Sequence, residues 1–177
     1  MSFSVNDLRG AMGVGVRPNL FRVTFDNGFI GAAGSAVSVL TKSAALPGQT
    51  IGTIEVPHVG GRRLKVAGDR TFADWTMTVI NDKDFTVRAA LEAYQEQFVT
   101  TNYNAVGVGA RTAVGAQAKL TTITVVQLDT NGLSPLRTYK LSNCFATEIS
   151  SIDLSYDSAD AIEEYTVNWT YDYFTVA

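Results

Sequence analysis

The sequence has little of the chemistry on which most enzymes and metal proteins depend. Among its 177 residues there is one cysteine, Cys144, and one histidine, His58. A single cysteine excludes a disulfide within the chain, which favours assembly in a reducing compartment. A zinc site would need two carboxylates besides these two residues, and no nucleophile-elbow motif accompanies the histidine. We therefore expect no enzyme, no metal and no cofactor; a hydrolase centred on His58 is the one catalytic alternative.

Cations and long apolar runs are also scarce. Lysine and arginine total 14 against 17 aspartates and glutamates, a net charge of -3, which is the wrong sign for a protein that grips phosphate. The glycine-rich segments 10–16 and 107–115 lack the spacing of a phosphate-binding loop. No run approaches the about 20 apolar residues of a membrane-spanning helix, and residues 1–16 lack the apolar core of a signal peptide. These features predict a soluble protein without membrane insertion, made and used without secretion.

What the sequence does contain is a succession of short segments with the apolar/polar alternation of β-strands. We expect strands over 17–25, two within 36–59, over 60–66, 73–80, 119–129 and 136–149, and a short and a long strand within 150–174. The period changes once, in 84–98, where the apolar residues recur at helical spacing. They are Val87, Leu91, Tyr94 and Phe98. This is the one helix that the sequence predicts.

These patterns predict a mainly β fold with one α-helix. Two packed antiparallel sheets, as a β-sandwich or a partly closed barrel, would bury the aromatic strand faces. We expect a single domain over residues 1–177. Within it, residues 1–16 are expected to be a flexible N-terminal arm and residues 99–118 a mobile loop.

The final strand suggests how the chain hides its sheet edges. Tyr165, Val167 and Trp169 alternate there with short polar residues, and the strand has no lysine or proline to blunt an exposed edge. Pairing with an identical copy would cover such an edge, and head-to-tail pairing that closes gives a ring, which can stack into a tube. The alternative from another class is a β-sandwich binding module that uses the aromatic residues to stack on sugars or bases.

Three separated blocks of the sequence resemble the tail tube protein of contractile-tailed bacteriophages. They are RPNLFRVTF (17–25), VAGDRTFADWTMTVINDKDF (66–85) and IDLSYDSADAIEEYTVNWTYDYF (152–174). LPGQTIGTIEV (46–56) falls where the family has a similar leucine-proline segment. Residues 1–16 and 99–118 depart from the family pattern.

The resemblance implies a phage tail-tube-like fold and a structural role in the virion, in the phage tail, after assembly in the host cytoplasm. Subunits of the family form hexameric rings whose inner sheets join into a continuous barrel, and the rings stack inside a contractile sheath. The implied partners are further copies of the chain, the tail sheath protein, and the baseplate and tail terminator proteins, with genomic DNA passing through the lumen. A baseplate tube initiator and a type VI-like secretion tube are the alternatives with a related fold.

A tube that carries DNA has a requirement of its own, because DNA must slide along its wall. A wall of threonine and carboxylate side chains avoids holding phosphate. On this basis the residues expected to face the lumen are Asp74, Thr76, Thr78, Glu164, Thr166, Thr170 and Asp172; the alternative is that they face the sheath or solvent. Asp69 and Arg70, in an expected turn over 68–70, are candidates for an ion pair between subunits, with a solvated turn as the alternative.

Overall fold

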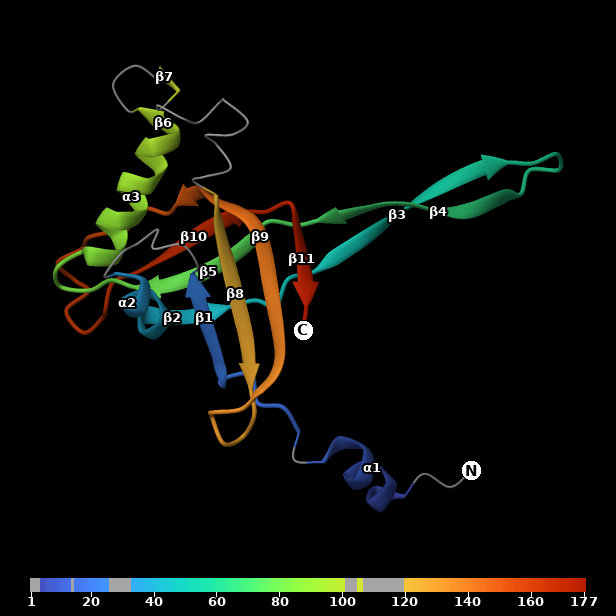
Figure 1. Ribbon diagram of the computed structural model, residues 1–177, viewed down its shortest axis with the longest axis horizontal. Coiled ribbons are helices and arrows are strands. Elements are labelled where there is room, and N and C mark those ends of the chain that lie inside the picture. Colours follow the sequence, from blue (N-terminus) through green and yellow to red (C-terminus); the bar gives the residue numbers. More distant parts are fainter. Residues whose placement is uncertain (1–3, 14, 26–32, 101–104, 107–119) are drawn as a thin grey trace.

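The computed structural model describes residues 4–13, 15–25, 33–100, 105–106 and 120–177 (Figure 1). Its main sheet has seven antiparallel strands in the order β1-β8-β9-β10-β5-β2, with β11 paired to β9. The strands are β1 Phe21–Phe25, β2 Thr41–Ala44, β5 Trp75–Ile80, β8 Thr121–Leu128, β9 Pro135–Ile149, β10 Glu164–Thr170 and β11 Tyr173–Val176.

The long strand β9 joins the two halves of this sheet. Its first part pairs with β8 on one side and β11 on the other, with Leu141 opposite both Ile123 and Phe174. Its last part pairs with β10. Between the two parts, Asn143 has a φ of 59°, a left-handed conformation that interrupts regular strand geometry. The predicted mainly β, antiparallel fold is confirmed. The two halves of a single sheet, which share β9, take the place of the two sheets that were expected.

Helix α3, Thr86–Phe98, confirms the helix predicted from spacing. Its Val87, Leu91 and Tyr94 are buried against the sheet, as the periodicity requires. At its start, the Asp82 carboxylate accepts a hydrogen bond of 3.1 Å from the backbone N–H of Thr86, which satisfies a donor that has no partner within the helix.

Two further helices were not predicted. Helix α1, Val5–Met12, lies in the segment expected to be an arm and begins with a capping box between Ser4 and Asp7. Helix α2, Ala33–Leu40, lies where a strand was expected to begin at residue 36. It contributes the fully buried Val37, whose carbonyl accepts a 2.7 Å hydrogen bond from the Thr41 hydroxyl. Figure 1 shows α1 set apart from the sheet and α2 beside β1 and β2.

The core lies between the sheet and helices α2 and α3. The odd-numbered residues of β5 and β10 point into it, as the alternation predicted: Trp75, Met77, Val79, Tyr165, Val167 and Trp169. The rings of Trp169 and Phe25 lie 5.3 Å apart at a tilted angle, an arrangement that aromatic pairs favour. Because these aromatic residues are buried, they are not available for stacking on a ligand, which removes the basis for the binding-module alternative.

Strands β3, Gln49–Pro57, and β4, Arg63–Phe72, form a separate two-stranded ribbon that extends far from the main sheet (Figure 1). The expected turn over 68–70 is wrong, because these residues lie inside β4. Gly68 faces Gly52 across a bulge, and a Cβ at Gly68 would lie 3.1 Å from the Gly52 carbonyl oxygen. The strand expected over 73–80 begins at Trp75.

The segment expected to be a mobile loop, 99–118, is described only in part. Strands β6, Val99–Thr100, and β7, Ala105–Val106, form a short antiparallel pair. The other positions of the segment, 101–104 and 107–118, lie outside the described residues.

Candidate functional site

The side of β5 and β10 that points away from the core is polar, and we call it the polar sheet face. Thr166 lies opposite Thr78, and Asn168 lies opposite Thr76. Of the seven residues predicted to face the lumen, six lie on this face or at its border: Asp74, Thr76, Thr78, Glu164, Thr166 and Thr170. The seventh, Asp172, lies at the break between β10 and β11. Strand alternation therefore placed these side chains together correctly; that they face a lumen stays a prediction.

Hydrogen bonds run across the polar sheet face from strand to strand. The Thr76 hydroxyl donates to Asn168 Oδ1 at 2.7 Å, and Asn168 Nδ2 donates to the Glu148 carboxylate at 2.8 Å. The Thr170 hydroxyl donates to the Asp74 carboxylate, also at 2.8 Å. These bonds tie polar side chains to the sheet, so the face presents a defined polar surface.

The polar sheet face also carries an excess of negative charge. Lys42 Nζ lies 2.5 Å from the Glu164 carboxylate and neutralises it, while Asn143 Nδ2 donates to the Asp172 carboxylate at 2.6 Å. The carboxylates of the face and its border are Asp74, Glu148, Glu164 and Asp172. A surface with this balance repels phosphate.

Sequence reasoning missed Glu148 and Lys42 as members of this face. Glu148 follows a bulge in β9, where Trp169 pairs with Ala146 and Asn168 pairs with Glu148. The bulge shifts the alternation by one residue. Lys42 reaches Glu164 because β2 pairs with β5 over a long sequence separation. Neither event leaves a local signal in the sequence.

The β3–β4 ribbon has two chemically different faces. On one, the aliphatic face, Ile54 lies opposite Val66, and Val56 lies opposite Leu64. These four side chains are between 45% and 63% exposed, so almost nothing in the described chain covers them. On the other face, Glu55 accepts a 2.7 Å ion pair from Arg63. An isolated two-stranded ribbon is marginally stable in water, so this element needs a further surface to pack against.

The predicted inter-subunit pair lies near the base of the ribbon. Asp69 and Arg70 are both exposed on β4, and Arg70 lies opposite Ile51. Among the described residues, neither of them forms an ion pair. Their part in a contact between subunits stays a prediction.

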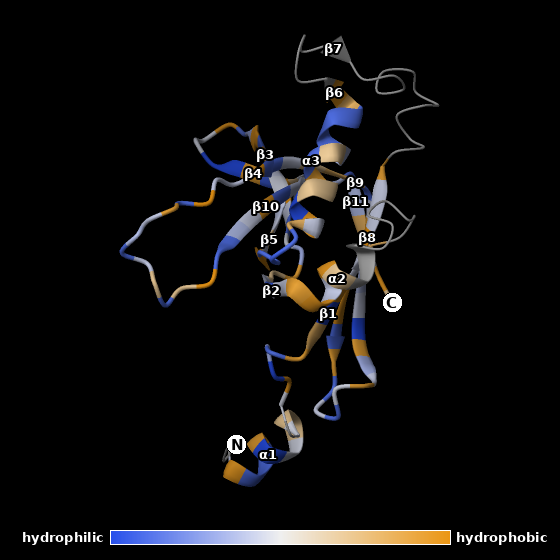
Figure 2. Cartoon of the chain, turned by 90° about the vertical axis from the view of Figure 1, so that its left-hand side faces the viewer, coloured by the Kyte–Doolittle hydropathy of each residue, from blue (hydrophilic) through white to orange (hydrophobic). Residues whose placement is uncertain are grey.

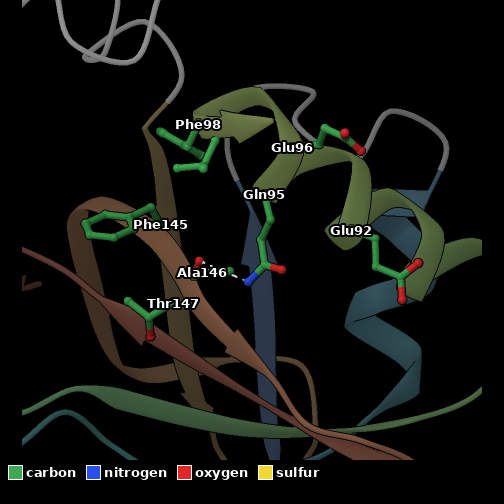
Figure 3. Close-up of a pocket in the computed structure, with 8 residues that line it drawn as sticks. Glu92, Gln95, Glu96, Phe98, Phe145, Ala146 and Thr147 are labelled. Atoms are coloured by element: carbon green, nitrogen blue, oxygen red, sulfur yellow. Dashed lines mark hydrogen bonds between the residues drawn. The ribbon is translucent and has the colours of Figure 1, made fainter. Parts of the chain in front are cut away.

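A groove lies on the helix side of the sheet, between α3 and β9, with a volume of about 720 Å³. Its lining includes Phe98 and Phe145, with Glu92 and Glu96 on the helix. Figure 3 shows Gln95 reaching from α3 towards β9, where its amide donates to the Ala146 carbonyl at 3.3 Å. The groove is therefore lined by both apolar and polar side chains, and it lies on the side of the sheet opposite the polar sheet face.

His58, the one catalytic candidate, and the single cysteine lie in different parts of the fold. His58 is exposed at the far end of the ribbon, with Nδ1 2.9 Å from the backbone oxygen of Val59. Cys144 is fully buried, and burial raises the pKa of its thiol to about 12. In the part of the chain that the structure describes, no three histidine, cysteine or acidic residues form a metal-binding group. The described helices include none that is both long and apolar enough to cross a bilayer.

Comparison with known proteins gives one consistent result. The sequence profile of the family described as "Phage tail tube protein" matches residues 9–177. The tail tube protein gp19 of Enterobacteria phage T4 is 30% identical over 159 residues, which cover 89% of this chain and 90% of that protein. The corresponding protein of Enterobacteria phage T6 is equally similar.

Solved structures show the same fold. A chain of the anti-feeding prophage cap, which terminates the tube of that particle, has a TM-score of 0.66 at 18% identity, covering 92% of this chain and 90% of that one. A chain of the sheath-tube complex of an extracellular contractile injection system has a TM-score of 0.60 at 15% identity, with 99% of both chains covered. The fold is therefore one that tubes of contractile particles use.

Proposed function

Because the chain belongs to the phage tail tube protein family, we propose that its copies form hexameric rings that stack into a tube for genome delivery. The family is structural and not enzymatic, and the chain is a tail tube protein of a contractile tail, located in the tail of the virion. The hexameric ring, the stacking and the passage of DNA are the parts that we propose, together with assembly in the host cytoplasm.

The observation that carries the proposal is the uncovered aliphatic face of the β3–β4 ribbon. Val56 and Leu64 are 45% and 63% exposed at the end of a ribbon that contacts little of its own chain. Burial of apolar surface is favourable by about 25 cal/mol per Å², and a second copy of the chain offers that burial. Helix α1 supports the same conclusion, since its Leu8 and Met12 are each 61% exposed.

The two sides of the main sheet then suit different positions in the tube, one towards the channel and the other towards the outside. We propose that the polar sheet face lines the channel, because its excess of carboxylates keeps DNA from binding. The groove between α3 and β9 would then lie on the outside of the tube, facing the sheath. The related chains seen in a sheath-tube complex and in a tube-terminating cap support the tail sheath and tail terminator proteins as partners; we propose the baseplate proteins as partners at the other end.

Electron microscopy of the purified full-length protein over a range of concentrations tests the assembly. We expect six-fold rings and tubes from the natural sequence. Val56→Asp places a charge on the aliphatic face and should abolish them, whereas Thr53→Asp, on the opposite face of β3, is the matched control. A natural protein that remains monomeric at every concentration would overturn the proposal.

Cysteine labelling of assembled tubes tests the orientation of the sheet. Cys144 is buried, so a cysteine introduced by Thr166→Cys or Glu92→Cys is the only accessible thiol among the described residues. In tubes, a large maleimide polymer should label the Glu92→Cys variant and spare the Thr166→Cys variant, while in dissociated subunits both should react. Equal labelling of both variants in intact tubes would show that the polar sheet face is not lumenal.

A further inference from the structure

The loop between β9 and β10, residues 150–163, is a second exposed apolar surface. Leu154 is 81% exposed, Ile162 is 72% exposed, and Tyr156 is entirely exposed. In Figure 2 the loop projects from the body of the molecule, with hydrophobic and hydrophilic residues along it. Loops of this length without regular structure are uncommon and are usually functional.

The two ends of this loop are held by the sheet. At one end, the Ser150 backbone N–H donates to the Thr166 carbonyl at 2.9 Å. At the other, Asn81 bonds both the backbone and the side chain of Glu163, at 2.9 and 2.8 Å. A turn at Ser155 shapes the middle, where its hydroxyl accepts from the Asp157 N–H at 3.2 Å. The exposed apolar side chains are therefore displayed on an anchored loop.

The loop is strongly acidic. Residues 150–163 contain no lysine or arginine, and their carboxylates are Asp153, Asp157, Asp160 and Glu163. Glu163 accepts a bond from Asn81, but no carboxylate of the loop forms an ion pair within the described residues. The loop therefore combines apolar contact groups with uncompensated negative charge.

The outer end of the β3–β4 ribbon has the complementary properties. It carries the cations Arg62, Arg63 and Lys65, and Glu55 is the one acidic residue between positions 50 and 68. Arg63 and Lys65 both lie near Glu55, at 2.7 and 4.0 Å, whereas Arg62 forms no ion pair with a described residue. Arg63 and Lys65 lie on the face opposite the aliphatic face, and Arg62 lies in the connection between the two strands, so the outer end of the ribbon has a net positive charge behind and beyond its aliphatic face.

We propose that the outer end of the ribbon of one copy docks on the 150–163 loop of a neighbouring copy. This inference rests on the proposed self-assembly and names the two surfaces that meet. The aliphatic face packs against Leu154, Tyr156 and Ile162, and the opposite charges attract the two surfaces and select their pairing. In Figure 1 the ribbon and the loop, the latter the orange-red segment between β9 and β10, lie at opposite ends of the molecule. The contact is therefore head-to-tail, and each copy can give one ribbon and receive another.

Charge substitutions test this contact, because a change on one surface can be compensated by the opposite change on the other. The loop variant combines Asp157→Lys with Asp160→Lys, and the ribbon variant combines Arg62→Glu with Val59→Glu, both in the connection between β3 and β4. Each alone brings like charges together and should raise the concentration needed for assembly by about tenfold or more. A chain with all four substitutions, or an equimolar mixture of the two variants, should assemble at close to the natural concentration, because opposite charges meet again.

Two controls separate loss of the proposed contact from a general effect of charge and from loss of stability. Asp84→Lys and Lys83→Glu change charge at exposed positions outside both surfaces and should leave assembly unaltered. All variants should melt at the natural temperature, since the substituted side chains are exposed. If the natural chain assembles but neither set of substitutions impairs it, or if recombining them gives no rescue, the docking proposal is wrong while the tube proposal stands. If the natural chain does not assemble at all, the tube proposal itself fails.

A cysteine pair gives a second readout that does not depend on charge. A chain carrying both Leu64→Cys and Tyr156→Cys should form a ladder of disulfide-linked multimers when assembled protein is oxidised, because each copy joins two neighbours. Chains with either substitution alone should give at most dimers. A double variant that assembles yet yields no ladder would overturn the proposed contact.

Discussion

Tyr94 and Cys144 meet where α3 packs against β9. The Tyr94 hydroxyl donates to the Cys144 backbone carbonyl at 3.1 Å, and both residues are buried. Tyr94→Phe removes this donor and leaves the carbonyl without it, so we expect the free energy of unfolding to fall by about 1 kcal/mol. Urea denaturation of the dissociated subunit measures this loss. Tyr156→Phe, at an exposed position, should cost nothing, and an unchanged Tyr94→Phe midpoint would contradict the prediction.

The thiol of Cys144 makes stability depend on alkaline pH. Burial raises its pKa from 9.0 to about 12 in the folded chain. The unfolded chain therefore loses the thiol proton at a lower pH than the folded chain does. Its contribution to stability is complete below about pH 9 and declines as the pH rises from about 9 towards 12. Denaturation midpoints at pH 8 and pH 10.5 should differ more for the natural chain than for Cys144→Ala.

Tyr165 adds to the alkaline effect, because burial raises the pKa of its hydroxyl to about 12. Some pH dependence should therefore remain in Cys144→Ala. Identical pH dependence in the natural chain and in Cys144→Ala would show that the thiol does not contribute.

At the scale of elements, the ribbon depends on two glycines that face each other. A Cβ at Gly68 would lie 3.1 Å from the Gly52 carbonyl oxygen and 3.2 Å from Ile54 Cγ1. Gly68→Val should therefore force β3 and β4 apart at the bulge and speed amide exchange along both strands. Because the ribbon contributes to the core packing only through Phe72, at its base, the unfolding midpoint of the main sheet should change little. Gly48→Ala, where a Cβ would meet nothing within 4 Å, is the control; unaltered exchange in Gly68→Val would refute the prediction.

Elements with a strong local period were predictable from the sequence. The spacing of Val87, Leu91 and Tyr94 predicted α3, and the alternation in β5 and β10 predicted which side chains are buried. The segment that forms α2 is different, because Val37 and Val39 favour a strand by propensity while burial of Val37 against the sheet decides for a helix. The 68–70 segment was misassigned because glycine beside two charged residues is typical of a turn.

The candidate surfaces also divide into those that local periodicity predicts and those that only the three-dimensional structure reveals. The polar sheet face was predictable as far as the period of two extends. The aliphatic face of the ribbon was not, because Ile54 and Val66 are ordinary strand residues until the structure shows that nothing covers them. The short strand expected at the start of segment 150–174 is wrong, because residues 150–163 form an irregular loop. The exposure of Leu154 and Tyr156 on this loop appears only in three dimensions.

For the whole molecule, the balance of charge on the polar sheet face should decide how DNA moves through an assembled tube. Thr78→Lys together with Thr166→Lys adds a pair of cations per subunit to this face, where the natural carboxylates repel phosphate. Tubes of this variant should retain short duplex DNA at low salt and release it at high salt, whereas natural tubes should retain none. Thr130→Lys, in the exposed turn between β8 and β9, is the control. Equal retention by natural and variant tubes would contradict a lumenal position.

The reach of the β3–β4 ribbon also matters before any tube exists. Before assembly, each chain exposes the aliphatic face and the unpaired strand edges of the ribbon. Unpaired strand edges of this kind can pair non-specifically with strands of other chains. At high concentration, free copies of the chain should therefore aggregate unless another protein covers the ribbon or assembly removes free subunits as quickly as they are made. The exposed β3–β4 ribbon therefore requires that the rate of synthesis stay matched to the rate at which free subunits are covered or assembled.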